Sequence, residues 1–333
     1  MPAEAFTVAT EDLARCPNCN SEKIVAWVSG RDRLLRVNNQ VFSYKRCENC
    51  DVAFQSPRPL EGSIHVYYPK DYGPFGRYET RTRLGIFGRM QGLVQRTSFN
   101  AINTFIGRPK FESKIQKFYE KLSEHPKILD FGCGSGKFLD KAMRSGCETI
   151  GMDFSEVALA QVASRGHRAF SVDEVGWNGI ADGSIKLTRM NHVIEHLYNP
   201  FAVLQRLHAK MSPGGFVHIA TPNSDSKSAR IYGQHWFSLD CPRHIVLFTP
   251  ATLQTLVARA GFEVLELLHE PLTKDMARSW LYRKIDSGRR RPEDVLSADQ
   301  DALLNFRFAW ASKSAAESGQ SDRIHLFARK PLD

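Results

Sequence analysis

The sequence predicts an α/β protein: a doubly wound, seven-stranded, mostly parallel sheet preceded by a small N-terminal zinc-binding module. From residue 127 onward, short apolar runs alternate with helical patterns, which is typical of a parallel sheet covered by helices on both faces. Two Cys-x-x-Cys pairs stand before that region. We therefore expect a zinc module at 1–60, a linker and helical cap at 61–125, and the sheet domain at 126–333, with an insertion at 271–321.

Four N-terminal cysteines form two pairs separated by 27 residues: Cys16-Pro-Asn-Cys19 and Cys47-Glu-Asn-Cys50. Stable disulfides are rare in proteins that are not exported, and cysteine pairs at this spacing bind zinc tetrahedrally. We predict a structural Zn²⁺ site, because four thiolates leave no open coordination position for chemistry. Free thiols or a redox pair are the alternatives. Residues 24–29 and 34–44 are expected to form the strands of a hairpin between the pairs.

Charge and hydropathy indicate which partners and which cell compartment the protein is expected to have. The formal charge is +9, whereas residues 126–270 hold 14 basic and 14 acidic residues and are neutral. Basic flanks suit nucleic acid, phosphorylated sugars or anionic lipid headgroups, and an ordinary solvated surface explains them equally well. No apolar run approaches the ~20 residues of a membrane helix, and the first residues do not resemble a signal peptide. We expect a cytoplasmic protein, with peripheral membrane contact and oligomeric state left open.

The linker and cap divide into two parts. Residues 61–80 are rich in Tyr, Pro and Gly and predict an irregular loop. Residues 81–122 have apolar positions at helical spacing, with basic residues between them. We expect this amphipathic helix to pack against its own protein, and a membrane surface is the alternative. The apolar positions are Leu84, Phe87, Met90, Leu93 and Val94.

The sheet domain is predicted element by element from periodicity and helix signals. Capping residues predict three helix starts, at Ser155, Asn199-Pro200 and Thr249-Pro250. Glycines at 146, 166 and 261 predict helix ends. The expected strands are 127–131, 148–152, 168–172, 185–190, 216–220, 262–268 and 323–329.

A glycine loop follows the first of these strands. Gly132, Gly134 and Gly136 let the backbone pass close to a ligand and turn into a helix N-terminus, which favours anionic atoms. Dinucleotide loops read GxGxxG, but Lys137 stands where the third glycine would be, so the loop fits GxGxG. Asp153 ends the second strand, where a carboxylate accepts hydrogen bonds from the ribose of NAD or of another riboside.

Several motifs in order resemble the class I S-adenosylmethionine-dependent methyltransferases. They are ILDFGCGSG (128–136), IGMDFS (150–155), NHVIEHL (191–197) and LHAKMSPGGFVHIATPN (207–223). Segment 236–264 resembles a subgroup in which a CxxC…CxxC module followed by a "YY" segment occurs in enzymes linked to sugars and surface polysaccharides. The resemblance implies a Rossmann-like methyltransferase fold, an enzyme, and S-adenosylmethionine as its cofactor.

Carried over by position, the resemblance implies which residues hold this cofactor. The loop would wrap the methionine part, Asp153 would hold the ribose, and Phe154 would pack on the adenine or belong to the core. The implied cofactor-binding residues are Asp130, Gly132, Cys133, Gly134, Gly136, Asp153, Phe154, Asp173 and Asn191.

The acceptor side is predicted from chemistry. Methyl transfer to a hydroxyl is helped by a base near its proton, and histidine suits neutral pH best. His192 follows the fourth strand at the carboxyl edge of the sheet, where ligands bind in open α/β folds. We expect His192, Glu195 and His244 to be catalytic. A helix-start acid is the structural alternative for Glu195.

Four further residues are expected to bind the acceptor substrate: His196, Tyr232, Trp236 and Arg243. The two larger aromatics would form a platform for a sugar ring, and Arg243 would hold a phosphate or carboxylate. The structural alternatives are core packing for the three ring residues and a loop-fixing salt bridge for Arg243.

The leading hypothesis is O-methylation of a sugar hydroxyl, in a nucleotide-linked, lipid-linked or polysaccharide acceptor. RNA- or ribosome-directed methylation and methylation of a phenol or quinone-type small molecule are the alternatives within enzymes. Thr221-Pro222-Asn223 lacks the Asn/Asp-Pro-Pro-aromatic pattern of many enzymes that methylate base amino groups, which makes nucleic acid the less favoured partner. A non-catalytic module that binds the cofactor or a partner is the alternative outside enzymes.

Overall fold

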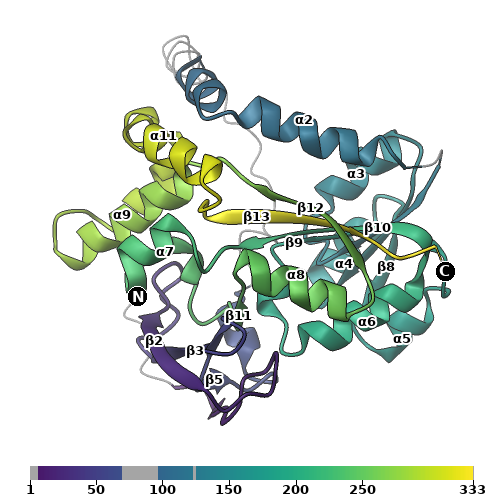
Figure 1. Ribbon diagram of the computed structural model, residues 1–333, viewed down its shortest axis with the longest axis horizontal. Coiled ribbons are helices and arrows are strands. Elements are labelled where there is room, and N and C mark those ends of the chain that lie inside the picture. The colour runs from purple at the N-terminus through teal and green to yellow at the C-terminus, as the bar shows by residue number, and fades with distance from the viewer. Residues whose placement is uncertain (1–6, 70–96, 123–124, 333) are drawn as a thin grey trace.

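A seven-stranded sheet forms the centre of the molecule (Figure 1). The computed structural model describes residues 7–69, 97–122 and 125–332. The strand order is β12-β13-β10-β9-β6-β7-β8, and β13 alone runs antiparallel to its neighbours. This confirms the predicted fold class. The strands are β6 (Lys127–Phe131), β7 (Glu148–Asp153), β8 (Arg168–Ser171), β9 (Ile185–Asn191), β10 (Met211–Pro222), β12 (Glu263–His269) and β13 (Arg323–Arg329).

Strand order reverses at β6, which pairs with β7 on one side and β9 on the other. Ligands of open α/β sheets bind beyond the carboxyl ends of the strands at such a reversal. The glycine loop follows β6, Asp153 ends β7, and His192 follows β9. The topology therefore places the predicted donor and acceptor residues at one edge of the sheet.

Helices cover both faces of the sheet, with α2 and α3 on one side and α5, α6 and α8 on the other (Figure 1). The predicted caps are present, because the side chains of Ser155, Asn199 and Thr249 each accept a hydrogen bond from the backbone N–H three residues later. The helices are α2 (Arg108–Tyr119), α3 (Lys137–Arg144), α4 (Glu156–Ala163), α5 (Glu174–Asn178), α6 (Pro200–Lys210), α7 (Lys227–Tyr232) and α8 (Pro250–Arg259).

The N-terminal module builds a second, four-stranded antiparallel sheet in the order β11-β4-β3-β2. Its strands are β2 (Ile24–Arg31), β3 (Val41–Cys47), β4 (Ala53–Gln55) and β11 (Val246–Leu247). The hairpin is as predicted, but the strand expected at 34–44 begins only at Val41. Asp32 accepts hydrogen bonds from the backbone of Leu35 and Val37 and so stabilises a loop there. A short pair, β1 (Thr10–Glu11) and β5 (Arg58–Pro59), lies beside it.

One hydrophobic core joins the module to the sheet domain. Phe54, Leu129, Ile150 and Leu326 are fully buried members of the same cluster, although Phe54 comes from the module. Each such side chain stabilises the fold by roughly 1.5–3 kcal/mol. The module is therefore packed into the molecule and is not an appendage.

Two regions differ from or extend the predictions. Strand β10 begins at Met211, before the expected 216, and an irregularity separates Met211 from Phe216. The 271–321 insertion is helical, with α9 (Lys274–Asp286), α10 (Asp294–Ser297) and α11 (Ala302–Glu317). The 3₁₀ turns are η1 (Ile64–Tyr67), η2 (Ile194–His196), η3 (Gly233–His235), η4 (Phe237–Leu239) and η5 (Ala298–Gln300).

The predicted amphipathic helix at 81–122 is described only in its later part. Residues 97–105 and α2 are helical, and Phe111 and Phe118 of α2 pack against Phe327 of β13. The apolar positions from Leu84 to Val94 lie outside the described residues. Among the helices of the described ranges, none is long and apolar enough to cross a membrane.

Candidate functional site

The glycine loop has a backbone conformation that requires glycine. Gly132, Gly134 and Gly136 have φ angles of +77°, +47° and +69°, in the left-handed region that favours glycine. A Cβ atom on Gly132 would lie 2.3 Å from the Val193 side chain. Gly136 also precedes the first turn of α3, whose free N–H groups face the loop. The loop therefore fits close approach of the expected cofactor to the backbone.

Asp153 connects the loop to the end of β7. Its two carboxylate oxygens accept hydrogen bonds from the backbone N–H of Gly134 and of Ser155, both at 2.9 Å. Burial raises the pKa of this carboxyl, and the backbone donors oppose that rise. A carboxylate held at this strand end matches the predicted ribose contact.

Asp130 and Arg189 form an ion pair beneath the loop. Arg189 of β9 donates to Asp130 of β6 at 2.9 Å, and Asp130 is 2% exposed. Burial raises the pKa of Asp130, whereas the Arg189 guanidinium lowers it. Asp130 therefore supports the loop from below. The two residues are directly paired in the register of adjacent strands, a contact visible only once the strand order is known.

The remaining predicted cofactor residues differ in their surroundings. Phe154 is 62% exposed at the end of β7, which favours the adenine alternative over the core alternative. Cys133 is buried and Asn191 ends β9. Asp173 caps α5, because its carboxylate accepts from Gly176 N at 2.8 Å and from Ser171 Oγ at 2.7 Å. The Asp173 carboxylate is thus already occupied by structural hydrogen bonds.

The acceptor side is centred on a buried carboxylate. Glu195 is 0% exposed; His192 Nδ1 lies 3.1 Å from its Oε1, and Thr221 Oγ1 donates to its Oε2 at 2.9 Å. His244 Nε2 lies 3.9 Å from the same Oε1. Burial alone would raise the pKa of Glu195, but the hydrogen bond with His192 and the neighbouring imidazoles lower it to about 2. Glu195 is therefore a carboxylate at neutral pH.

Two imidazoles beside it have their proton positions set by the main chain. His244 Nδ1 lies 2.8 Å from Ser238 O, and His196 Nδ1 lies 2.9 Å from Arg243 O. A carbonyl oxygen only accepts hydrogen bonds, which assigns a proton to Nδ1 in both rings. Burial lowers the pKa of His196, so this ring is neutral. A histidine with a free Nε2 lone pair beside a carboxylate is suited to act as a base.

The same groups also have the composition of a cation site. One ligand atom from each of Glu195, His196 and His244 lies within 4.8 Å of the others. Both oxygens of Glu195 are already engaged, by His192 and Thr221. Because a metal would compete with these hydrogen bonds, the geometry favours proton transfer over metal binding.

Backbone strain marks the same site. His192 and Asp240 adopt positive φ angles of 55° and 33°, which non-glycine residues rarely do. His192 N donates to Ala220 O at 2.8 Å, which fixes the turn after β9. Such conformations cost about 1–3 kcal/mol and cluster at functional sites.

Tyr68 was not predicted as a site residue, and it lies between the two halves of the site. Its ring contacts Phe154 at a centroid distance of 5.6 Å, and its hydroxyl lies 3.0 Å from His196 Nδ1. Thr221 was also missed as a partner of Glu195. Tyr68 belongs to the "YY" segment and Thr221 to the β10 motif, but the sequence offers no signal for where their side chains point.

Three predicted acceptor residues do not face an open site. Arg243 is 0% exposed and is paired with Asp240 and with Asp32 of the N-terminal module. Trp236 is 1% exposed and donates to Asp322 at 2.8 Å, and Tyr232 is also buried. Within the part of the chain that the structure describes, Trp236 and Tyr232 therefore form no exposed platform for a sugar ring, and buried carboxylates already pair with Trp236 and Arg243.

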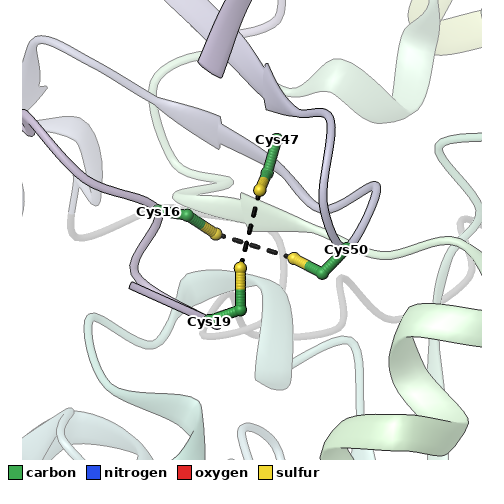
Figure 2. A group of neighbouring side chains, drawn as sticks. All are labelled: Cys16, Cys19, Cys47 and Cys50. Carbon is green, nitrogen blue, oxygen red and sulfur yellow. Dashed lines mark hydrogen bonds between the residues drawn. The ribbon is translucent and has the colours of Figure 1, made fainter. Parts of the chain in front are cut away.

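The four predicted zinc ligands converge on one point (Figure 2). Cys16 and Cys50 have their sulfurs 3.6 Å apart, as do Cys19 and Cys47. Sulfurs about 2.3 Å from a tetrahedral zinc lie about 3.8 Å from one another, so these distances fit the ion. Two matching turns present the pairs, because Asn20 and Asp51 each have positive φ and donate to the carbonyl of the first cysteine of their pair.

The part of the chain that contains the site is similar to known proteins. Residues 106–267 match the family model "Methyltransferase domain". A "Ubiquinone biosynthesis O-methyltransferase" of Psychrobacter arcticus is 27% identical over 177 residues, 48% of this chain and 68% of that protein. A protein of the same name from Pseudomonas aeruginosa is 27% identical over 165 residues, 44% of this chain and 70% of its own.

Among solved structures, an S-adenosylmethionine-dependent methyltransferase from Archaeoglobus fulgidus has 22% sequence identity and a TM-score of 0.43. The match covers 70% of this chain and 99% of that one.

Proposed function

We propose that this chain, whose residues 106–267 match a methyltransferase domain, is an S-adenosylmethionine-dependent methyltransferase that methylates a hydroxyl oxygen of a small aromatic molecule. The single observation that carries the proposal is the neutral imidazole of His196 and the Nδ1-protonated ring of His244 beside the Glu195 carboxylate. This arrangement suits removal of a proton from a hydroxyl group. Hydroxyl acceptors need such a base more than amino acceptors that already carry a free lone pair.

The proposed step moves one proton and one methyl group. The bound cofactor supplies a sulfonium-activated methyl, so the protein mainly aligns the acceptor and excludes water. The glycine loop and Asp153 would hold S-adenosylmethionine as the methyl donor, and His244 Nε2 would take the proton of the acceptor hydroxyl. The Glu195 carboxylate stabilises the resulting imidazolium, because it lies 3.9 Å from Nε2 in a buried setting.

Two observations favour an aromatic acceptor. The relatives are named ubiquinone biosynthesis O-methyltransferases, a name that points to a hydroxyl on a small molecule. The Tyr68 ring lies between Phe154 on the donor side and His196 on the acceptor side, where it suits contact with a planar acceptor ring.

A sugar hydroxyl is the second candidate. It is favoured by the CxxC…CxxC module followed by Tyr67-Tyr68, the combination that resembles sugar-linked methyltransferases. The burial of Trp236 and Tyr232 removes the sugar platform that this hypothesis expected, which is why we place it second.

A panel of defined acceptors tests the proposal. Purified protein with S-adenosylmethionine would be incubated with a catechol such as protocatechuate, with a nucleoside diphosphate sugar, or with total tRNA. Mass spectrometry would then detect added methyl groups. We expect methylation of the catechol. Methylation of the sugar alone supports the second candidate, and methylation of tRNA alone, or of none while cofactor binds, contradicts the proposal.

Replacing the proposed base tests the mechanism. His244→Gln should lower kcat by about 10²- to 10⁴-fold, the usual contribution of a general base. The dissociation constant for S-adenosylhomocysteine should stay unchanged, because His244 lies outside the glycine loop. His125→Gln, at an exposed histidine that contacts Gly146, is the matched control. An unchanged kcat in His244→Gln would show that this residue is not the base.

A further inference from the structure

The segment that carries His244 belongs to the sheet of the N-terminal module. Its strand β11 pairs with β4, in the register Val246 to Phe54 and Leu247 to Ala53. Gln55 N also donates to Ile245 O at 2.9 Å. The seven-stranded sheet contains neither β11 nor β4. The proposed base is therefore held by an element that comes from the other end of the sequence.

Arg243 connects that segment to the β2–β3 hairpin through buried charges. Its guanidinium donates to Asp32 at 2.9 Å, to Asp240 Oδ1 at 2.6 Å and to Asp240 Oδ2 at 3.0 Å. The side chains of Arg243 and Asp32 are both 0% exposed. A buried cation is strongly unfavourable without its carboxylate partner, so Asp32 constrains where Arg243 can lie. The carbonyl of Arg243, in turn, accepts from His196 Nδ1 at 2.9 Å.

Tyr44 of β3 constrains the next residue. Its side chain is 1% exposed, and its hydroxyl donates to the backbone carbonyl of His244 at 2.8 Å. The hairpin thus fixes two successive peptide units, one whose carbonyl sets the proton position of His196 and one that carries the His244 ring. Tyr44 contacts a main-chain carbonyl and Asp32 contacts the Arg243 side chain, so both residues act on the imidazole rings through other groups.

We propose that the β2–β3 hairpin positions the acceptor-side histidines, with Asp32 and Tyr44 as positioning residues that act through Arg243 and the His244 main chain. The inference rests on the proposed roles of His196 and His244 in hydroxyl methylation. Asp32 and Tyr44 touch neither the glycine loop nor Asp153. Their loss should therefore change the histidines and leave the donor side intact.

Two variants separate positioning from general stability. Tyr44→Phe removes one oxygen atom and keeps the buried ring, and Asp32→Asn removes the charge that faces Arg243. Glu22→Gln is the matched control, because this exposed carboxylate on the same module pairs only with Arg15 among the described residues. The primary measurement is the ¹⁵N spectrum of the imidazole nitrogens, recorded with S-adenosylhomocysteine bound. Its dissociation constant and the melting temperature are measured in parallel.

We expect the His244 and His196 signals to move away from a single Nδ1-protonated form in both variants and to stay in place in Glu22→Gln. The dissociation constant for S-adenosylhomocysteine should remain within about twofold. With an acceptor that the wild type methylates, kcat should fall about tenfold while KM for S-adenosylmethionine is unchanged.

Unchanged imidazole signals in Tyr44→Phe overturn the proposal. A fall in the affinity for S-adenosylhomocysteine as large as the fall in kcat also overturns it. If Asp32→Asn does not fold, Tyr44→Phe alone decides, since it leaves packing nearly intact. The spectra are informative even if no tested acceptor is methylated. If the proposed function is wrong, no acceptor is methylated but the imidazole ¹⁵N signals still shift in the variants. If the positioning inference is wrong, these signals do not shift.

Discussion

The donor half and the acceptor half of the site are built in different ways. On the donor side, the glycine loop, Asp130 and Asp153 come from two adjacent strands and the turns that follow them. On the acceptor side, His196 and His244 depend on contacts with Tyr44, Tyr68 and the buried pair of Asp32 and Arg243. The donor half is therefore local in sequence, and the acceptor half is assembled from segments that lie far apart in the sequence.

This difference has an energetic consequence. The donor loop is stabilised by the parallel sheet itself, through pairing of β6 with β7 and β9. The acceptor half is stabilised by the N-terminal module, which in turn depends on the cysteine cluster. Perturbations of the module should therefore disturb acceptor geometry more than donor binding.

Removal of the metal should have the largest effect. Structural zinc contributes about 10–16 kcal/mol in zinc-finger peptides, so a chelator or Cys47→Ser should unfold the N-terminal module. The hydrogen bond from Thr252 to Cys50 O and the β4–β11 pairing should be lost with it. Hydrogen exchange should show loss of protection at 24–55 and 245–247, with 127–153 affected less. Metal analysis should find one zinc per chain.

The outcome that contradicts this separation is simultaneous loss of protection in all three segments, which would mean that module and sheet domain unfold as one unit. Ser29→Ala, at an exposed hairpin position away from the sulfurs, serves as a control that should retain the metal. Purified protein without zinc but with a protected module would refute the structural zinc site.

Acid should destabilise the acceptor half through Glu195. Its pKa is about 2 in the folded protein, below its ordinary value of 4.5, so its stabilising effect is complete above about pH 5. The effect is lost as pH falls toward 2, and it amounts to about 3 kcal/mol. Glu195→Gln should lower the free energy of unfolding at pH 7 by a similar amount and make it depend less on pH between 5 and 2.5.

Denaturant unfolding at a series of pH values measures this effect. The exposed Glu120, changed to Gln, is the control and should leave the pH dependence unaltered. The free energy of unfolding of Glu195→Gln should still depend on pH to some extent, because Asp240 also has a lowered pKa. Burial would raise the pKa of Asp240, but the Arg243 guanidinium lowers it to about 2. An identical slope in wild type and Glu195→Gln would mean that folding does not change the pKa of Glu195.

The donor half was easier to predict from the sequence than the acceptor half, because its residues lie close together in the chain. The sheet strands, three helix caps, the glycine loop and the Asp153 strand end were predictable, because each depends on residues close in the chain. The convergence of the four cysteines was predictable because their chemistry requires it. The boundary of β3 was misplaced because the Asp32 loop interrupts an otherwise strand-like run.

The acceptor side was predictable only in part. His192, Glu195 and His244 do converge, but Arg243 and Trp236 are buried instead of facing an acceptor. Their partners, Asp32 and Asp322, lie 211 and 86 residues away in the sequence. Side-chain direction at such positions depends on long-range packing, and neither periodicity nor motif spacing contains that information.

The smallest expected effect concerns the donor half alone. Asp153→Ala removes a carboxylate that accepts from Gly134 and Ser155 and is placed to accept from ribose hydroxyls. Loss of charge-assisted hydrogen bonds of this kind should weaken S-adenosylhomocysteine binding about tenfold to a hundredfold, measured by calorimetry. Asp182→Ala, at an exposed carboxylate paired with Lys210, is the control. The imidazole ¹⁵N signals of His196 and His244 should stay unchanged in both variants. Unchanged affinity would show that the end of β7 does not hold the ribose, whereas shifted histidine signals would show that the two halves are coupled through the sheet.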